Sequence, residues 1–81
     1  MKARVTVRLK GGVLDPQGMT IQKSLGSLGY DEVAAVRQGK IFDLEMRAAD
    51  PGRARARLEE MCRRLLANPV VEEYQVEIVP G

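Results

Sequence analysis

Apolar and polar residues alternate strictly near the start of the chain. The apolar set is Ala3, Val5, Val7 and Leu9, and the polar set between them is Arg4, Thr6, Arg8 and Lys10. A period of two places these sets on opposite faces of a β-strand. The pattern predicts a strand with one buried face and one face toward solvent or a partner, and Gly11-Gly12 ends it.

Two Asp-Pro pairs predict helix starts. In Asp15-Pro16 and Asp50-Pro51, the aspartate offers an N-cap carboxylate, and proline fits the first helical position, where its missing N–H costs nothing. Gly29 is a suitable C-terminal stop for the first helix. Asn68-Pro69 ends the second, because proline cannot continue a helix.

Both predicted helices have an apolar side. It comprises Ile21, Leu25 and Leu28 in the first helix, and Ala54, Leu58, Met61, Cys62, Leu65 and Leu66 in the second. These spacings predict one buried stripe on each helix. Gly18 and Gly26 weaken the first helix by roughly 1 kcal/mol each relative to alanine, so each marks either a close backbone approach or a tolerated cost.

The middle of the chain favours a β-hairpin. Val33 to Gln38 is moderately strand-like, Gly39 suits a turn, and Lys40 to Arg47 alternates. The alternation sets Phe42, Leu44 and Met46 opposite Ile41, Asp43, Glu45 and Arg47. The turn is not of the Asn-Gly type, so one longer, bent strand is the alternative. A last strand carries Tyr74, Val76 and Ile78 on one face and Gln75, Glu77 and Val79 on the other.

The predicted order is β-α-β-β-α-β in one domain, residues 1–81. This is an α+β fold of the ferredoxin-like type, an antiparallel sheet with two helices packed on one face. The other face would carry mainly polar residues: Arg4, Thr6, Arg8, Ile41, Glu45 and Gln75. An antiparallel sheet can leave such a face in water or pack it on another protein. A chain this small gains stability from association, so we expect a dimer.

Composition removes most catalytic chemistry. The chain has no histidine and a single cysteine, Cys62, which excludes the Ser-His-Asp and Cys-His systems and most zinc and redox sites. Thirteen basic and 11 acidic residues give a net charge of +2, and only Tyr30, Phe42 and Tyr74 are aromatic. Neither property suits a nucleic-acid binder. The sequence holds no apolar run of membrane-spanning length and no signal-like start, so we expect a cytoplasmic protein.

The glycine-rich segment 10–18 is the strongest candidate for binding chemistry. A strand-to-helix loop of this kind can capture phosphate at the helix N-terminus. However, it lacks both the G-x-x-x-x-G-K-[ST] and the G-x-G-x-x-G spacing, and Asp15 would repel an anion. The loop is therefore either a tight turn with a helix cap or a recognition loop for a partner or substrate.

Four segments together resemble the PurS-type small subunit of phosphoribosylformylglycinamidine (FGAM) synthase. They are residues 9–18 (LKGGVLDPQG), 25–30 (LGSLGY), 36–40 (VRQGK) and 61–74 (MCRRLLANPVVEEY). The resemblance covers nearly the whole chain, and the order and spacing of the segments make it specific. Gly12 and Val71 are mild variants of the family pattern, and Gly26 replaces a more usual alanine.

This resemblance implies a role in de novo purine biosynthesis. In the family, the small subunit joins a glutaminase subunit and a large ATP-dependent synthetase subunit. The complex converts formylglycinamide ribonucleotide, glutamine and ATP into formylglycinamidine ribonucleotide, glutamate, ADP and phosphate. The small subunit is expected to be a homodimer without catalytic residues that bridges the other two and assists ammonia transfer. ATP and magnesium are expected on the synthetase subunit.

The resemblance also selects candidate interface residues. They are Lys10, Gly11, Asp15, Pro16, Gln17, Gly18, Arg37, Gly39, Lys40, Asn68, Pro69 and Tyr74. Turn and cap geometry is an equal alternative for these positions, above all for Asp15 and Asn68. The alternative function is a small ferredoxin-like regulatory module that binds a metabolite.

Overall fold

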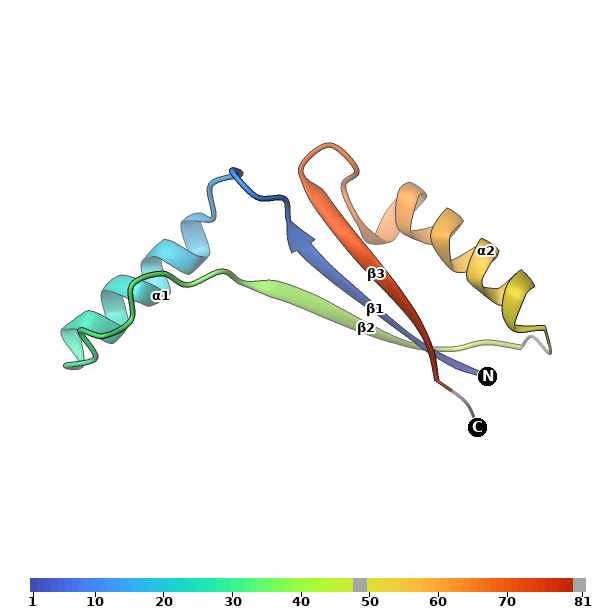
Figure 1. Ribbon diagram of the computed structural model, residues 1–81, viewed down its shortest axis with the longest axis horizontal. Coiled ribbons are helices and arrows are strands. Elements are labelled where there is room, and N and C mark those ends of the chain that lie inside the picture. Colours follow the sequence, from blue (N-terminus) through green and yellow to red (C-terminus); the bar gives the residue numbers. More distant parts are fainter. Residues whose placement is uncertain (48–49, 80–81) are drawn as a thin grey trace.

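The structure, a computed structural model, describes residues 1–47 and 50–79. Its elements are β1 (Lys2–Leu9), α1 (Pro16–Ser27), β2 (Gly39–Glu45), α2 (Pro51–Met61), a π-helical turn η1 (Cys62–Leu66) and β3 (Glu72–Val79). The strands form an antiparallel sheet in the order β2-β1-β3 (Figure 1). The predicted α+β fold with an antiparallel sheet and two helices is therefore confirmed.

The predicted hairpin is wrong, and the observed order is β-α-β-α-β. Gly39 does not turn the chain; it begins β2 and pairs with Arg8 of β1. Residues 33–38 pair with no strand and run beside α1, whose Gln22 donates a side-chain hydrogen bond to the carbonyl oxygen of Ala34 (2.8 Å) (Figure 1). We call residues 10–38, which include α1 and this segment, the arm. Side chains, rather than a neighbouring strand, satisfy backbone groups of the segment 33–38.

The core lies on one face of the sheet. Its largest fully buried side chains are Val5, Val7, Leu58 and Cys62. β1 is the central strand, so its apolar residues have neighbours on both sides, and the buried side of α2 and η1 packs over them. Phe42, Leu44 and Met46 adjoin this core but are only partly buried. The cover is thus incomplete on the β2 side.

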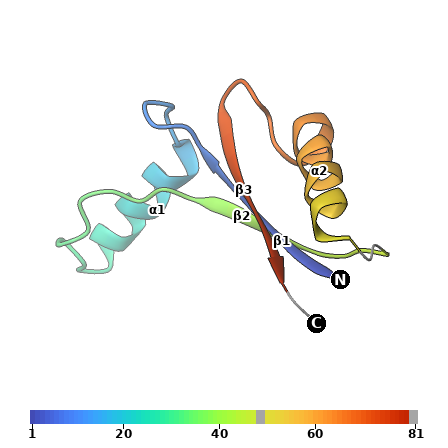
Figure 2. The same ribbon diagram turned by 45° about the vertical axis from the view of Figure 1, so that its right-hand side comes forward.

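The first helix does not pack on the sheet, contrary to the prediction of two helices on one face. α1 lies beyond the end of the sheet, whereas α2 runs alongside β3 (Figures 1 and 2). The described chain is accordingly elongated, 50 × 28 × 14 Å. The predicted buried stripe of α1 is open to solvent, with Ile21 39% and Leu28 73% exposed. A helix can bury a stripe only against other atoms, and among the described residues the segment 33–38 is what runs beside α1.

A π-helical turn explains one further error. Leu65 was expected on the buried side of the second helix, but it is 83% exposed. The N–H of Ala67 bonds to the carbonyl oxygen of Cys62 (2.9 Å), five residues back, so the turn holds one residue more than an α-helical turn. The extra residue keeps Ala67 buried and Leu66 against the core while Leu65 turns outward.

The opposite face of the sheet is polar, as predicted. Register places Arg4 between Asp43 of β2 and Glu77 of β3, and Arg4 donates to Asp43 (2.9 Å). Ile41 and Val79 are exposed on this face, at 60% and 37%. Within the described residues, no helix is long and apolar enough to cross a membrane.

Candidate functional site

Three segments meet where β1 ends and β2 and β3 begin. They are the loop 10–18, the segment 36–40 and the turn 68–72, and we call this region the corner. Lys10 donates from Nζ to the carbonyl oxygen of Pro69 (2.8 Å). Arg37 donates from Nη1 to Val13 (2.7 Å) and from Nη2 to Lys10 (3.0 Å), in both cases to carbonyl oxygens. The side chains of Lys10 and Arg37 thus link the three segments by hydrogen bonds to backbone carbonyl groups.

Asp15 is the buried anion of the corner. One carboxylate oxygen accepts the N–H of Gly18 (2.8 Å) and caps α1; the other accepts the N–H of Gln38 (2.7 Å). The N–H of Gln38, followed by that of Gly18, holds the pKa of Asp15 below its ordinary value and outweighs burial, which acts in the opposite direction. Asp15 therefore stays ionised and ties the start of α1 to the segment that leads into β2.

Two glycines allow the close approach of backbones here. A Cβ at Gly18 would collide with the carbonyl oxygen of Val36, and one at Gly39 would lie 2.9 Å from the carbonyl oxygen of Val7. Gly18 is thus a position of close backbone approach. A Cβ at Gly26 would meet nothing within 4 Å among the described residues, so no close approach there requires a glycine.

A shallow cavity of about 290 Å³ opens at the corner. Its wall includes five of the predicted interface residues: Asp15, Pro16, Gln17, Gly39 and Lys40. Lys40 lies 3.8 Å from a carboxylate oxygen of Glu72 and 5.6 Å from the centre of the Phe42 ring. Pro16, Gln17 and Lys40 are exposed.

Asn68 shapes the turn before β3. Its side-chain oxygen accepts the N–H of Val70 (3.0 Å), and its own N–H donates to Glu72 (2.7 Å). Glu72 therefore serves two segments, because it also lies beside Lys40. Glu72 is not among the predicted interface residues, although the alternation of β3 places it on the same face as Tyr74 and Val76.

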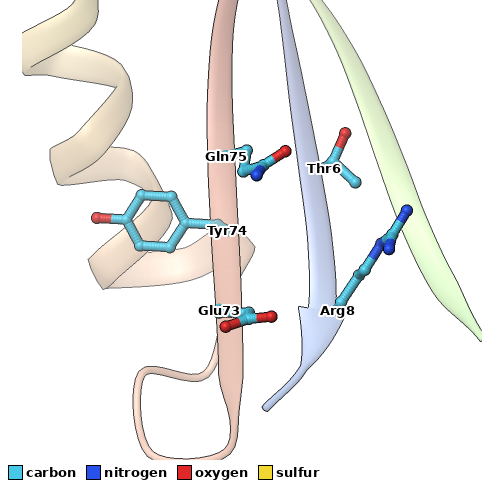
Figure 3. Close-up of a pocket in the computed structure, with 5 residues that line it drawn as sticks. All are labelled: Thr6, Arg8, Glu73, Tyr74 and Gln75. Atoms are coloured by element: carbon cyan, nitrogen blue, oxygen red, sulfur yellow. The ribbon is translucent and has the colours of Figure 1, made fainter. Parts of the chain in front are cut away.

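Two predicted residues stand apart from the cavity. Tyr74 is half-buried beside the core, and its ring points away from the polar sheet face that carries Thr6 and Gln75 (Figure 3). Those two residues, with Arg8, Glu73 and Tyr74, line a separate cavity of about 260 Å³ (Figure 3). Gly11 lines a third cavity with Arg37, on the other side of the loop.

The polar side chains of the corner hold segments of the chain together. Among the residues that the structure describes, no three carboxylate or thiol side chains gather as metal ligands. The Cys62 thiol is fully buried in the core, and burial raises its pKa. The arginine and aspartate of the corner bind backbone groups of their own chain. Missing from the sequence analysis was Gln38, which contributes only its N–H, and no sequence signal marks such a role.

The described residues thus form a small α+β domain with an arm that lies beyond the end of its sheet (Figure 1). The chain matches the family model PurS, described as phosphoribosylformylglycinamidine (FGAM) synthase, over residues 2–80. It belongs to this family, as the resemblance implied.

Named relatives match along their length. A protein of Methanocaldococcus jannaschii named phosphoribosylformylglycinamidine synthase subunit PurS is 42% identical over 77 residues, which is 95% of this chain and 93% of the relative. The PurS subunit of Bacillus subtilis is 44% identical over 77 residues, 95% of this chain and 90% of the relative.

Solved structures agree. The M. jannaschii PurS crystal structure superposes with a TM-score of 0.84 and 42% identity, covering 94% of this chain and 92% of that one. A chain of the PurLQS structure from Thermotoga maritima also gives 0.84, at 37% identity, covering 94% and 93%. The β-α-β-α-β architecture is thus shared with solved PurS chains.

Proposed function

We propose that this chain is the PurS subunit of FGAM synthase and acts in de novo purine biosynthesis. The observation that carries the proposal is the match, along nearly the whole chain and in the fold, to subunits of that name and to a chain of a PurLQS structure. In this role it bridges the glutaminase and the ATP-dependent synthetase subunits in the cytoplasm and assists the passage of ammonia between them.

This subunit contributes no catalytic residue in the proposal. Support comes from the corner, where Asp15 and Arg37 are held by backbone groups of the same chain and are not free to bind a substrate. ATP and magnesium bind the synthetase subunit, where the chemical step takes place. The small subunit acts through the surfaces that it presents.

The corner is the proposed contact with a neighbouring subunit. Its residues divide into two groups. Pro16, Gln17 and Lys40 line the cavity and are exposed, so they face the partner. The others hold the segments in place through hydrogen bonds or close approach: Lys10, Asp15, Gly18, Arg37, Gly39, Asn68 and Pro69.

The active form is a homodimer. Among the described residues, two apolar surfaces are incompletely covered: the α1 stripe with Ile21 and Leu28, and the sheet face at Phe42 and Leu44. A groove beside that face is lined by Met46 and Met61 among other residues. A second copy supplies an apolar surface for each, and burying both adds hydrophobic stabilisation that an 81-residue chain lacks alone.

Reconstitution tests the function. Glutamine-dependent formation of FGAM is measured with purified glutaminase and synthetase subunits, with and without this chain, and then with ammonium salt in place of glutamine. The expected result is a large loss of the glutamine-dependent rate without this chain, while the ammonia-dependent rate persists. Equal glutamine-dependent rates in both mixtures would overturn the proposal.

Light scattering tests the homodimer. At micromolar concentration the expected mass is twice the 9.0 kDa of the chain. A monomeric mass would contradict this part of the proposal and leave the uncovered surfaces for other subunits.

A further inference from the structure

The most exposed large apolar side chain among the described residues lies in η1, three residues before Asn68 of the corner. Leu65 is 83% exposed in η1, directly after Arg63 and Arg64, which are also exposed. We call these three residues the Leu65 patch. Neither the corner contact nor the dimer proposed above uses them.

The backbone places Leu65 outside. Ala54, Leu58 and Cys62 follow one another at intervals of four along the buried side of α2 and η1. A continuing α-helix would turn residue 65, three positions after Cys62, toward that same side. The bond from the Ala67 N–H to the Cys62 carbonyl oxygen instead makes a π-turn, and Leu65 is presented to solvent. π-turns are rare in proteins, and those that do occur often lie at functional sites.

The helix that carries Leu65 is rich in basic residues. Residues 51–66 hold five arginines, at 53, 55, 57, 63 and 64, and two glutamates, at 59 and 60. The helix therefore carries a net charge of +3, although the whole chain carries +2. Arg57 and Arg64 both lie near Glu60, and Arg55 donates to the carbonyl oxygen of Val76. For Arg63, no hydrogen bond or ion pair occurs within the part of the chain that the structure describes.

We infer that the Leu65 patch is a docking surface for an acidic protein partner, a different subunit of the synthase complex that has an apolar socket for Leu65. The inference rests on the proposed function. Arginine is among the residue types that binding hot spots favour, and two exposed arginines directly precede the exposed Leu65. The basic charge of the helix selects an acidic rim on the partner. Leu65 is exposed, and it is not among the residues of the proposed dimer surfaces.

The test uses the full chain and measures its affinity for the glutaminase and the synthetase subunits by calorimetry. Leu65→Asp should weaken binding to one of them at least tenfold, and Arg63→Glu should weaken it less, with a smaller salt dependence than the wild type shows. The matched control is Ile41→Asp, the same kind of change at an apolar residue, 60% exposed, on the polar sheet face. It should bind as the wild type does.

Several outcomes would overturn the inference. Wild-type affinity for both subunits in Leu65→Asp, with melting unchanged, removes the docking surface and leaves the proposed function intact. Failure of the wild-type chain to bind either subunit removes both. Equal losses in Leu65→Asp and Ile41→Asp show a general effect of added charge. A lower oligomer mass in Leu65→Asp assigns the patch to self-association, and wild-type binding to RNA that Arg63→Glu abolishes assigns it to phosphates.

Discussion

The body and the arm of this molecule are held together in different ways. The body is the sheet with α2 and η1, and its centre is apolar: Val5, Val7 and Leu58 are at most 1% exposed. The arm, residues 10–38, encloses no comparable core. Its attachment depends on a few polar side chains, chiefly Asp15 and Arg37, that bond to backbone groups.

This difference shows which half can stand alone. Burial of apolar surface is the main source of folding stability, and the body has it. The arm has defined geometry but exposes Ile21 and Leu28 of its apolar stripe. The polar bonds of the corner attach the arm to the body, and the proposed homodimer would supply the apolar burial that the arm lacks.

The largest expected effect lies in the body. Leu58→Ala removes a fully buried side chain from the centre of the core and leaves a cavity, so the free energy of unfolding should fall by about 3 kcal/mol. Urea denaturation at one fixed protein concentration measures this, because association contributes to apparent stability. The matched control is Leu65→Ala, at the 83% exposed position, with a change of less than about 0.5 kcal/mol. Similar losses at the two positions would refute the description of the core.

A substitution at the root of the arm should come next. In Gly18→Ala the new methyl group meets the carbonyl oxygen of Val36, so α1 and the segment 33–38 must separate. We expect a loss of roughly 1–3 kcal/mol, the range for overpacking. Hydrogen exchange should show lost protection in residues 16–38, while β1 and β3 keep theirs.

The control for that experiment is Gly26→Ala in the same helix. Nothing lies within 4 Å of the new methyl group, so the substitution should stabilise α1 by about 1 kcal/mol. If Gly26→Ala destabilises the arm as much as Gly18→Ala does, then α1 tolerates a methyl group at neither position. The close approach at Gly18 would then not be the cause of the destabilisation.

Asp15→Ala should have a smaller effect that depends on pH. It leaves the N–H groups of Gly18 and Gln38 without their acceptor, and the melting temperature at pH 7 should fall by about 4–8 °C, as for the loss of a helix cap in a domain of this size. Because folding lowers the pKa of Asp15, its contribution is present above the unfolded-state pKa and is lost as pH falls through the folded-state pKa.

Thermal melts from pH 7 to pH 2 of both proteins measure this contribution. The difference in melting temperature should shrink below about pH 4, the region where an aspartate in an unfolded chain titrates. Asp50→Ala, which removes a cap bond to Gly52 alone, is the control and should cost less. A difference that stays constant down to pH 2 would show that the charge of Asp15 is not what holds the arm.

Local signals in the sequence predicted much of the body and the ends of the helices. Both Asp-Pro pairs begin helices as expected, because a cap acts within one turn: Asp15 accepts from Gly18 and Asp50 from Gly52. The faces of β1 were also correct, since alternation needs only an extended backbone. The predicted site residues of three segments do meet, because those segments lie at the same end of an antiparallel sheet.

Errors arose where distant contacts decide the structure. Residues 33–38 have the composition of a strand, but Gln22 and Asp15 bind their backbone and no strand does. The stripe of α1 was correct as a spacing, but Ile21 and Leu28 are exposed because α1 lies beyond the end of the sheet. The prediction for Leu65 was wrong because the π-turn contains one extra residue, which moves this side chain from the buried to the exposed side of the helix. No sequence signal marks that extra residue.

The smallest effect should come from the charged surface of the body. Glu60→Gln removes an exposed carboxylate that lies 3.8 Å from Arg57 and 3.4 Å from Arg64. Such pairs gain little in water and are screened by salt, so the free energy of unfolding should change by less than about 0.5 kcal/mol. Urea denaturation at low and at 0.5 M salt (about a 4 Å screening length) measures it. A loss of unfolding free energy as large as that of Gly18→Ala would mean that surface ion pairs stabilise the body as strongly as the corner contacts stabilise the arm. The contrast between the two regions would then be wrong.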